Sequence, residues 1–224
     1  MGSRSSTWVV IPLFNESQVI SEVLQSLLVE FSNVVCVDDA SSDDSGQKAL
    51  EAGAYVITHP INLGQGAALR TGMDFVLRQK GAQSVITFDS DGQHRVEDAI
   101  SMLNRLNQGD VDIVIGSRFL DGRTKPGFLK KLVLKTAIFF SNASTGVRLT
   151  DAHNGLRVLT IGSAKVIRIT QNRMAHASEI ISEISRNKLR VAEVPVHVIY
   201  TDYSKSKGQS ILNSINILSD LFMK

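Results

Sequence analysis

The sequence predicts an α/β fold in which a mostly parallel central sheet is flanked by helices. Short apolar runs alternate with amphipathic stretches through the first half of the chain. The apolar runs are nearly continuous, which is typical of strands that helices cover on both faces. Polar residues also gather where several of these runs end. Because ligands of such sheets bind beyond the carboxyl ends of the strands, we expect the functional site at that edge.

The composition sets limits on the class of protein. The chain has 224 residues, 43% hydrophobic and 21% charged, which suits one domain with a tail. A net charge of +2 gives no reason to expect a nucleic-acid partner. The single cysteine, Cys36, lies in an apolar run, so we expect a buried thiol and a reducing, cytoplasmic environment. No run approaches the roughly eighteen apolar residues of a membrane span, so any membrane contact should be peripheral.

The elements of the first half follow in order from these patterns. The first helix is indicated by apolar residues at helical spacing, and the second is closed by Gly53. We expect strands at residues 7–12, 34–37, 54–58, 84–88 and 111–115, and helices at 16–31, 43–53, 66–79 and 96–106.

The second half is less regular. Residues 127–140 combine Lys130, Lys131 and Lys135 with apolar residues, which fits either a helix on a membrane surface or an ordinary core helix. A short strand should follow the polar loop 150–157. We expect helices at 161–169 and 177–187, a strand at 191–200 with Pro195 indicating an edge or a bulge, and a polar loop at 202–210. Ile211, Ile215, Leu218 and Phe222 mark a final amphipathic helix that could dock on the core, on lipid or on a second copy in a homodimer.

Acidic and amide residues occupy the strand ends. Asp89-Ser90-Asp91 follows a predicted strand, and such a carboxylate pair can hold a divalent metal together with substrate phosphates. The same residues are also typical of a plain turn. Other strands end in Pro12–Glu16, in Asp38-Asp39 and in Gly116-Ser117-Arg118. Helix capping by Asn15, Ser42 or Asp43 would explain part of this set, but not two adjacent carboxylates.

The ordered motifs resemble those of a known enzyme family. They are Pro12–Glu16, Val37–Asp43, Asn62–Gly64 with Gly66–Gly72, Asp89–His94, and Gly116–Arg118. Together they resemble the family 2 glycosyltransferases of the GT-A fold. The form of Asp89–His94 and of Asp151–Arg157 looks most like the dolichyl- or polyprenyl-phosphate sugar transferase branch. The resemblance covers about residues 7–200.

The resemblance implies a division of the chain. Residues 7–200 would be the GT-A domain, whereas the short, polar segment 1–6 is expected from its own sequence to be a disordered N-terminus or a tag remnant. Within that domain, 7–118 would bind the nucleotide-sugar and 119–200 the acceptor. Residues 201–224 would form a C-terminal loop and helix.

The resemblance also implies roles for individual residues. Asp89, Asp91 and Gln93 would bind Mg²⁺ or Mn²⁺, and Asp91 would be essential to catalysis. Arg118 would contact phosphate, for which a guanidinium fork is suited. Lys207 could reach a donor or acceptor phosphate. The full set expected to bind the nucleotide-diphospho-sugar is Pro12, Leu13, Asn15, Glu16, Asp39, Gly66, Asp89, Ser90, Asp91, Arg118 and Lys207.

The acceptor decides whether the reaction needs a general base. A phosphate is already anionic, whereas a sugar hydroxyl needs a proton acceptor nearby. Glu179, His176 and Asp151 are the candidates, each with a plain structural alternative as helix surface, cap-region residue or turn. The segment 172–179 departs from the polyprenyl-phosphate pattern, so the acceptor stays open between a lipid phosphate and a cell-envelope glycan.

We therefore expect a metal-dependent, inverting hexosyltransferase that uses a UDP- or GDP-sugar, in the cytoplasm or at the inner face of the membrane. A sugar nucleotidyltransferase shares the fold but usually has a Gly-rich loop after the first strand, where this chain has Pro12–Glu16. A non-catalytic nucleotide-sugar-binding subunit is a further alternative, although the complete acidic set disfavours it.

Overall fold

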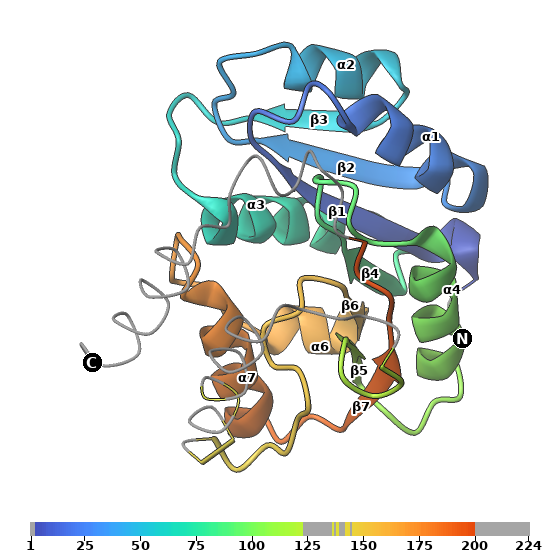
Figure 1. The fold of residues 1–224 in the computed structure, drawn as a ribbon, viewed down its shortest axis with the longest axis vertical. Helices are drawn as coiled ribbons and strands as arrows, with labels where there is room; N and C mark the ends of the chain where they lie inside the picture. Colours follow the sequence, from blue (N-terminus) through green and yellow to red (C-terminus); the bar gives the residue numbers. More distant parts are fainter. Residues whose placement is uncertain (1–2, 123–135, 137, 139–141, 144, 200–224) are drawn as a thin grey trace.

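The computed structural model describes residues 3–122, 136, 138, 142, 143 and 145–199. Its strands form one seven-stranded sheet in the order β3-β2-β1-β4-β6-β5-β7 (Figure 1). The strands are β1 Thr7–Leu13, β2 Asn33–Asp38, β3 Tyr55–Thr58, β4 Ser84–Thr87, β5 Ile113–Ser117, β6 Arg157–Thr160 and β7 Val191–Pro195. The helices are η1 Arg4–Ser6, α1 Ile20–Glu30, α2 Ser45–Glu51, α3 Gln65–Leu77, α4 Val96–Leu106, α6 Ile161–Val166 and α7 His176–Arg186.

The sheet is mostly parallel, as the sequence predicted. β1 pairs in parallel with β2 and β4, β2 with β3, and β5 with β7. β6 runs antiparallel between β4 and β5. Because β6 runs in the opposite direction to β4, the first residue of β6, Arg157, pairs with the last residue of β4, Thr87.

Two apolar layers cover the two faces of the sheet. Val9 and Ile11 of β1 pack against one layer, which includes side chains of α1, α2 and α4. Trp8 and Val10 pack against the other, which includes side chains of α3, α6 and α7 (Figure 1). This two-sided burial explains why the strands read as continuous apolar runs. Cys36 is fully buried, as expected, and burial raises the pKa of its thiol to about 12.

Some element boundaries differ from those predicted. α1 begins at Ile20 instead of residue 16, and no side chain of the described residues caps it. The expected cap by Asn15 is therefore wrong. Asn15 has a positive φ of 54°, and its Oδ1 accepts a hydrogen bond of 2.8 Å from the Ser42 N–H, so it joins two loops. β7 ends at Pro195 on an edge of the sheet, which confirms the edge that this proline indicated.

Several predicted features lie outside the described residues. These are most of the basic segment 127–140, the loop 202–210 with Lys207, and the final helix. Within the described ranges, none of the helices has the length and apolarity to cross a bilayer.

Candidate active site

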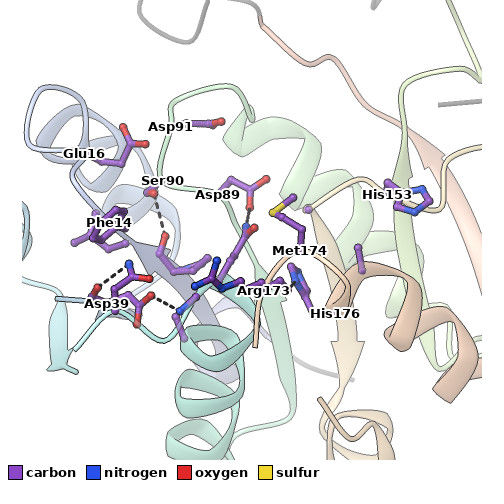
Figure 2. A pocket seen from close by; sticks show the side chains of 18 of the residues that line it. Phe14, Glu16, Asp39, Asp89, Ser90, Asp91, His153, Arg173, Met174 and His176 are labelled. Atoms are coloured by element: carbon purple, nitrogen blue, oxygen red, sulfur yellow. Dashed lines mark hydrogen bonds between the residues drawn. The ribbon is translucent and has the colours of Figure 1, made fainter. Parts of the chain in front are cut away.

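A cavity of about 500 Å³ lies at the carboxyl ends of β1, β2 and β4. Residues of both halves of the chain line it, and Figure 2 shows Asp89 between the Glu16 and Asp91 side and the segment that carries Met174 and His176. The first half contributes Pro12, Leu13, Phe14, Glu16, Asp39, Asn62, Gly64, Gln65, Ala68, Asp89, Ser90 and Asp91. The second half contributes His153, Gly155, Arg157, Arg173, Met174, His176 and Ala177. The size suits a ligand the size of a nucleotide sugar.

Asp39 organises one wall of the cavity. Its carboxylate accepts hydrogen bonds from the Leu63 N–H at 2.9 Å and the Gly64 N–H at 2.6 Å, and it lies 2.7 Å from Nδ1 of His59. These bonds fix the turn that leads into α3. A carboxylate has about four acceptor positions, so Asp39 retains capacity for a further N–H donor.

The tips of β1 and β4 are joined directly. Ser90 Oγ donates a hydrogen bond of 2.9 Å to the backbone carbonyl of Pro12. The bond holds the Asp89–Asp91 segment against the end of β1. Pro12, Leu13, Glu16 and Ser90, which were predicted to bind the nucleotide-diphospho-sugar, all line the same cavity. The Phe14 ring, 45% exposed, stands at the same wall and offers a flat apolar face.

Asp89 and Asp91 form the acidic centre of the cavity. Oδ2 of Asp89 lies 2.9 Å from Nε2 of His94, and its Oδ1 accepts from Gln65 Nε2 at 3.1 Å. Burial raises the pKa of Asp89, but the hydrogen bond and charge of His94 and the charge of Arg157 outweigh burial and hold the pKa below its ordinary value. Burial and the neighbouring charge of Asp89 raise the pKa of Asp91 to about 6, with a further contribution from Glu16.

This chemistry fits a divalent cation. The raised pKa of Asp91 reflects its burial and the negative charge of Asp89, and a cation would relieve the repulsion between the two carboxylates. Among the described residues, no three His, Cys, Asp or Glu side chains are gathered into a complete metal site. Two carboxylates that leave positions for phosphate oxygens are the usual arrangement for Mg²⁺. Asp89 and Asp91 are the residues that would hold the metal.

Gln93 does not border the cavity, although the sequence predicted it as a metal ligand. Its backbone N–H donates a hydrogen bond of 3.0 Å to Oδ1 of Asp91. In this geometry Gln93 positions the carboxylate of Asp91.

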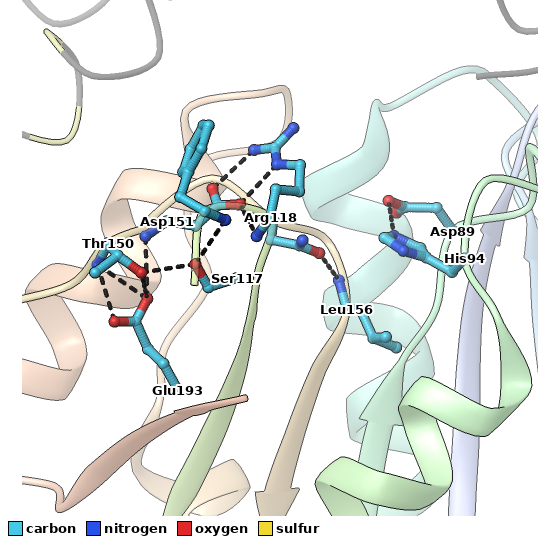
Figure 3. A network of polar contacts seen from close by, with 10 residues as sticks. Asp89, His94, Ser117, Arg118, Thr150, Asp151, Leu156 and Glu193 are labelled. Carbon is cyan, nitrogen blue, oxygen red and sulfur yellow. Dashed lines mark hydrogen bonds and ion pairs between the residues drawn. The ribbon is translucent and has the colours of Figure 1, made fainter. Parts of the chain in front are cut away.

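Arg118 and Asp151 lie outside the cavity and pair with each other (Figure 3). Nε and Nη2 of Arg118 lie 2.6 and 2.7 Å from the two carboxylate oxygens of Asp151. Burial raises the pKa of Asp151, but the charge and hydrogen bonds of Arg118 hold it below its ordinary value. The described cavity therefore does not include Arg118 or Asp151, and their predicted contacts with a phosphate and with an acceptor do not follow from its geometry.

Glu179 and Gly66 also have structural roles. The Glu179 carboxylate accepts hydrogen bonds from the Thr170 and Gln171 N–H groups, each at 2.9 Å, and so fixes the loop before α7. A Cβ on Gly66 would collide with the backbone carbonyl of Gln171, so this glycine permits close packing of α3. Neither residue borders the cavity, so the predicted roles of Glu179 as a base and of Gly66 as a nucleotide-sugar contact do not follow from its geometry. Asn15 lies outside the cavity as well.

Two histidines border the cavity on its second-half side. His176 Nδ1 lies 2.7 Å from the backbone carbonyl of Arg173, to which a neutral imidazole donates. Burial, with the nearby charge of Arg157, lowers the pKa of His176 to about 4. Burial also lowers the pKa of His153 to about 4. Both are neutral near pH 7, and a base with so low a pKa is weak.

The sequence analysis assigned no role to Arg157, Gln65 or His59, although Arg157 ends the Asp151–Arg157 motif. Arg157 is 1% exposed and borders the cavity. Its signal is a lone charged residue within the apolar run Leu156–Leu159, where a buried strand would exclude a charge. Gln65 and His59 carry no such signal, because each looks like an ordinary loop residue until Asp89 and Asp39 are placed beside them.

Comparisons with known proteins show the family and the fold of the chain. Residues 8–159 match the model of glycosyl transferase family 2. The chain is 34% identical over 231 residues to an uncharacterized protein of Methanocaldococcus jannaschii, with 99% of this chain and 93% of that protein covered. It is 28% identical to the UDP-N-acetylglucosamine–dolichyl-phosphate N-acetylglucosaminyltransferase of Methanococcus voltae, with 96% and 94% covered.

Two further similarities support the fold and the branch. The undecaprenyl-phosphate mannosyltransferase of Micrococcus luteus is 25% identical, with 91% of this chain and 90% of that protein covered. The crystal structure of Mycobacterium tuberculosis glucosyl-3-phosphoglycerate synthase superposes with a TM-score of 0.73 at 17% identity, over 96% of this chain and 78% of that one. The predicted GT-A fold and the resemblance to polyprenyl-phosphate sugar transferases are confirmed, and the chain belongs to glycosyl transferase family 2.

Proposed function

We propose that this protein transfers a hexose from a nucleotide-diphospho-sugar to a polyprenyl phosphate, with a divalent metal and with inversion at the anomeric carbon. The observation that carries the choice of acceptor is the lack of an effective base among the predicted candidates. Asp151 is buried in an ion pair, Glu179 holds a loop, and His176 has a pKa of about 4. A phosphate acceptor needs no base, because it is already anionic.

The donor would occupy the first-half wall of the cavity. Asp39 retains acceptor capacity for an N–H of the base, and the Phe14 ring offers a face for stacking. Asp89 and Asp91 would hold the metal and, through it, the diphosphate. When bound, Mg²⁺ or Mn²⁺ offsets the negative charge that builds on the departing diphosphate.

The reaction balances without a proton transfer. An oxygen of the acceptor phosphate attacks the anomeric carbon, and a new carbon–oxygen bond forms there. The bond from this carbon to the β-phosphate oxygen breaks, and the nucleoside diphosphate leaves with the electron pair. The residues of this chain bind and orient the two anions, and the cavity walls exclude water that would hydrolyse the donor.

The relatives support this assignment. The names of the Methanococcus voltae and Micrococcus luteus proteins describe transfer to dolichyl phosphate and to undecaprenyl phosphate. Several solved neighbours contain a uridine nucleotide with Mn²⁺ or Mg²⁺. A lipid acceptor would place this protein at a membrane surface during its reaction, in the synthesis of cell-envelope glycans.

A donor and acceptor screen tests the proposal. UDP- and GDP-sugars are incubated with Mn²⁺ or Mg²⁺ and either a polyprenyl phosphate or a hydroxyl-bearing glycan. Release of nucleoside diphosphate and the mass and anomeric configuration of the product are measured. We expect an inverted lipid-phosphate sugar, lost on adding a chelator. Transfer to the glycan alone would contradict the acceptor, and release of pyrophosphate would indicate a nucleotidyltransferase.

A further inference from the structure

Arg157 carries a buried charge that has no hydrogen-bond partner within the part of the chain that the structure describes. The side chain stands on β6, is 1% exposed and borders the cavity. Its Nε, Nη1 and Nη2 atoms are all buried, and none of the described residues accepts a hydrogen bond from them. A buried charge without hydrogen bonds costs a protein stability. Its position at a cavity wall therefore points to a ligand that supplies the missing partners.

The two carboxylates that act on Arg157 are both bound elsewhere. Burial lowers the pKa of Arg157 to about 10, while the charges of Asp89 and Asp151 act in the opposite direction. At neutral pH the guanidinium therefore stays positive. Asp89 is hydrogen-bonded to His94 and Gln65, and Asp151 to Arg118. Neither gives Arg157 a hydrogen bond, so its N–H groups remain available.

The cavity is acidic on one side and basic on the other. The carboxylates that line it, Glu16, Asp39, Asp89 and Asp91, all come from the first half of the chain. The second half contributes Arg157 and Arg173. Next to them, the two neutral histidines add no negative charge. A planar guanidinium with free N–H groups suits the oxygens of a phosphate.

We propose that Arg157 binds a phosphate group of the substrate, in the role that the sequence suggested for Arg118. This inference rests on the proposed function, and it adds that Arg157 is a residue that binds a phosphate of the donor or of the acceptor. The phosphate belongs either to the acceptor or to the donor diphosphate, since both offer the same oxygens. The bound anion would compensate the charge of the guanidinium and accept hydrogen bonds from its N–H groups.

The test compares the wild type with Arg157→Met, which keeps an unbranched apolar side chain, and Arg157→Gln, which keeps a polar one. Arg190→Met is the matched control, because Arg190 is exposed and pairs with Asp112 away from the cavity. Thermal unfolding midpoints and dissociation constants are measured with inorganic pyrophosphate, with UDP or GDP plus Mn²⁺, and with farnesyl phosphate. Each probe reports binding without turnover.

We expect Arg157→Met to unfold, without ligand, at the wild-type temperature or above it, because an uncompensated charge has been removed. Its affinity for at least one phosphate probe should fall roughly 10- to 100-fold, as expected for charged hydrogen bonds. Arg190→Met should bind as the wild type does. A loss confined to the nucleotides would assign Arg157 to the donor, and a loss confined to farnesyl phosphate would assign it to the acceptor.

Unchanged affinity for all the probes in a folded Arg157 variant would overturn the inference, and Arg157→Gln decides the matter if Arg157→Met does not fold. Failure of the proposed function looks different. A wild type that binds pyrophosphate through Arg157, but binds neither UDP nor GDP, would keep the phosphate site and remove the nucleotide-sugar assignment.

Discussion

Asp151 and Arg118 form a buried ion pair in which both carboxylate oxygens are engaged, at 2.6 and 2.7 Å from Nε and Nη2. The Arg118 backbone N–H donates to the same carboxylate at 3.1 Å. In addition, Glu193 accepts hydrogen bonds from the Thr150 and Asp151 N–H groups (Figure 3). The loop that precedes β6 is therefore anchored to β5 and β7 by charge.

Asp151→Asn should destabilise the protein by about 3 to 5 kcal/mol, because it leaves the Arg118 charge buried without its counter-ion. Urea unfolding measures the loss. Asp110→Asn is the control, since Asp110 pairs with Arg105 at the surface and should change little. Equal losses in the two variants would contradict the anchoring role of Asp151.

The histidines of the cavity predict a pH dependence of stability. The pKa values of His153 and His176 are lowered from 6.5 to about 4 in the folded protein. As the pH falls from 6.5 to 4, the unfolded chain binds more protons than the folded one, so the free energy of unfolding decreases. His176→Gln should flatten this slope, and His197→Gln, outside the cavity, should retain it. Urea titrations at several pH values measure both.

Asp91→Asn should lower transfer by at least about 100-fold while the protein stays folded, because the metal and diphosphate lose a ligand. Donor turnover and metal affinity by calorimetry are the readouts. Asp74→Asn, an exposed change on α3, is the matched control and should leave both unchanged. Wild-type turnover in the Asp91 variant would remove the metal-site assignment.

Glu179→Gln separates a catalytic base from a structural carboxylate. We expect transfer to polyprenyl phosphate to continue near the wild-type rate, with a stability loss of about 1 kcal/mol from the weakened bonds to Thr170 and Gln171. If Glu179 were a general base, its replacement would instead lower kcat by about 10²- to 10⁴-fold. Steady-state kinetics with saturating acceptor distinguishes the two results.

Gly155→Ala should impair the acidic centre through sterics alone. A Cβ at this position would collide with the carboxylate of Asp89. We expect weaker metal binding and slower transfer with little change in the far-ultraviolet circular dichroism spectrum. Gly162→Ala is the control, since its Cβ would meet only Thr160 Oγ1 at 3.8 Å. Identical kinetics in the two variants would show that Asp89 moves freely.

The sequence predicted what depends on local pattern. Strand β1 and helix α4 follow from apolar periodicity, and Asp89-Ser90-Asp91 is recognisable because the motif is contiguous. The partner of Arg118 could not be predicted in this way, because Asp151 comes from a loop 33 residues away. No role was predicted for Arg157, because the evidence for one is that none of the described residues accepts a hydrogen bond from its buried N–H groups, and this is visible only once those residues are placed around it.

The packing of α3 has a consequence for protein engineering. Gly64 and Gly66 allow the first turn of this helix to contact the backbone at Gln171 and Asn172, and the Ala67 N–H donates to the Asn172 carbonyl at 3.1 Å. The segment that carries Arg173, Met174 and His176 is thus held against the cavity wall that the first half of the chain forms. A chimaera that exchanges this segment between relatives to alter acceptor choice should also exchange the start of α3, because a bulkier residue at either glycine would displace the graft.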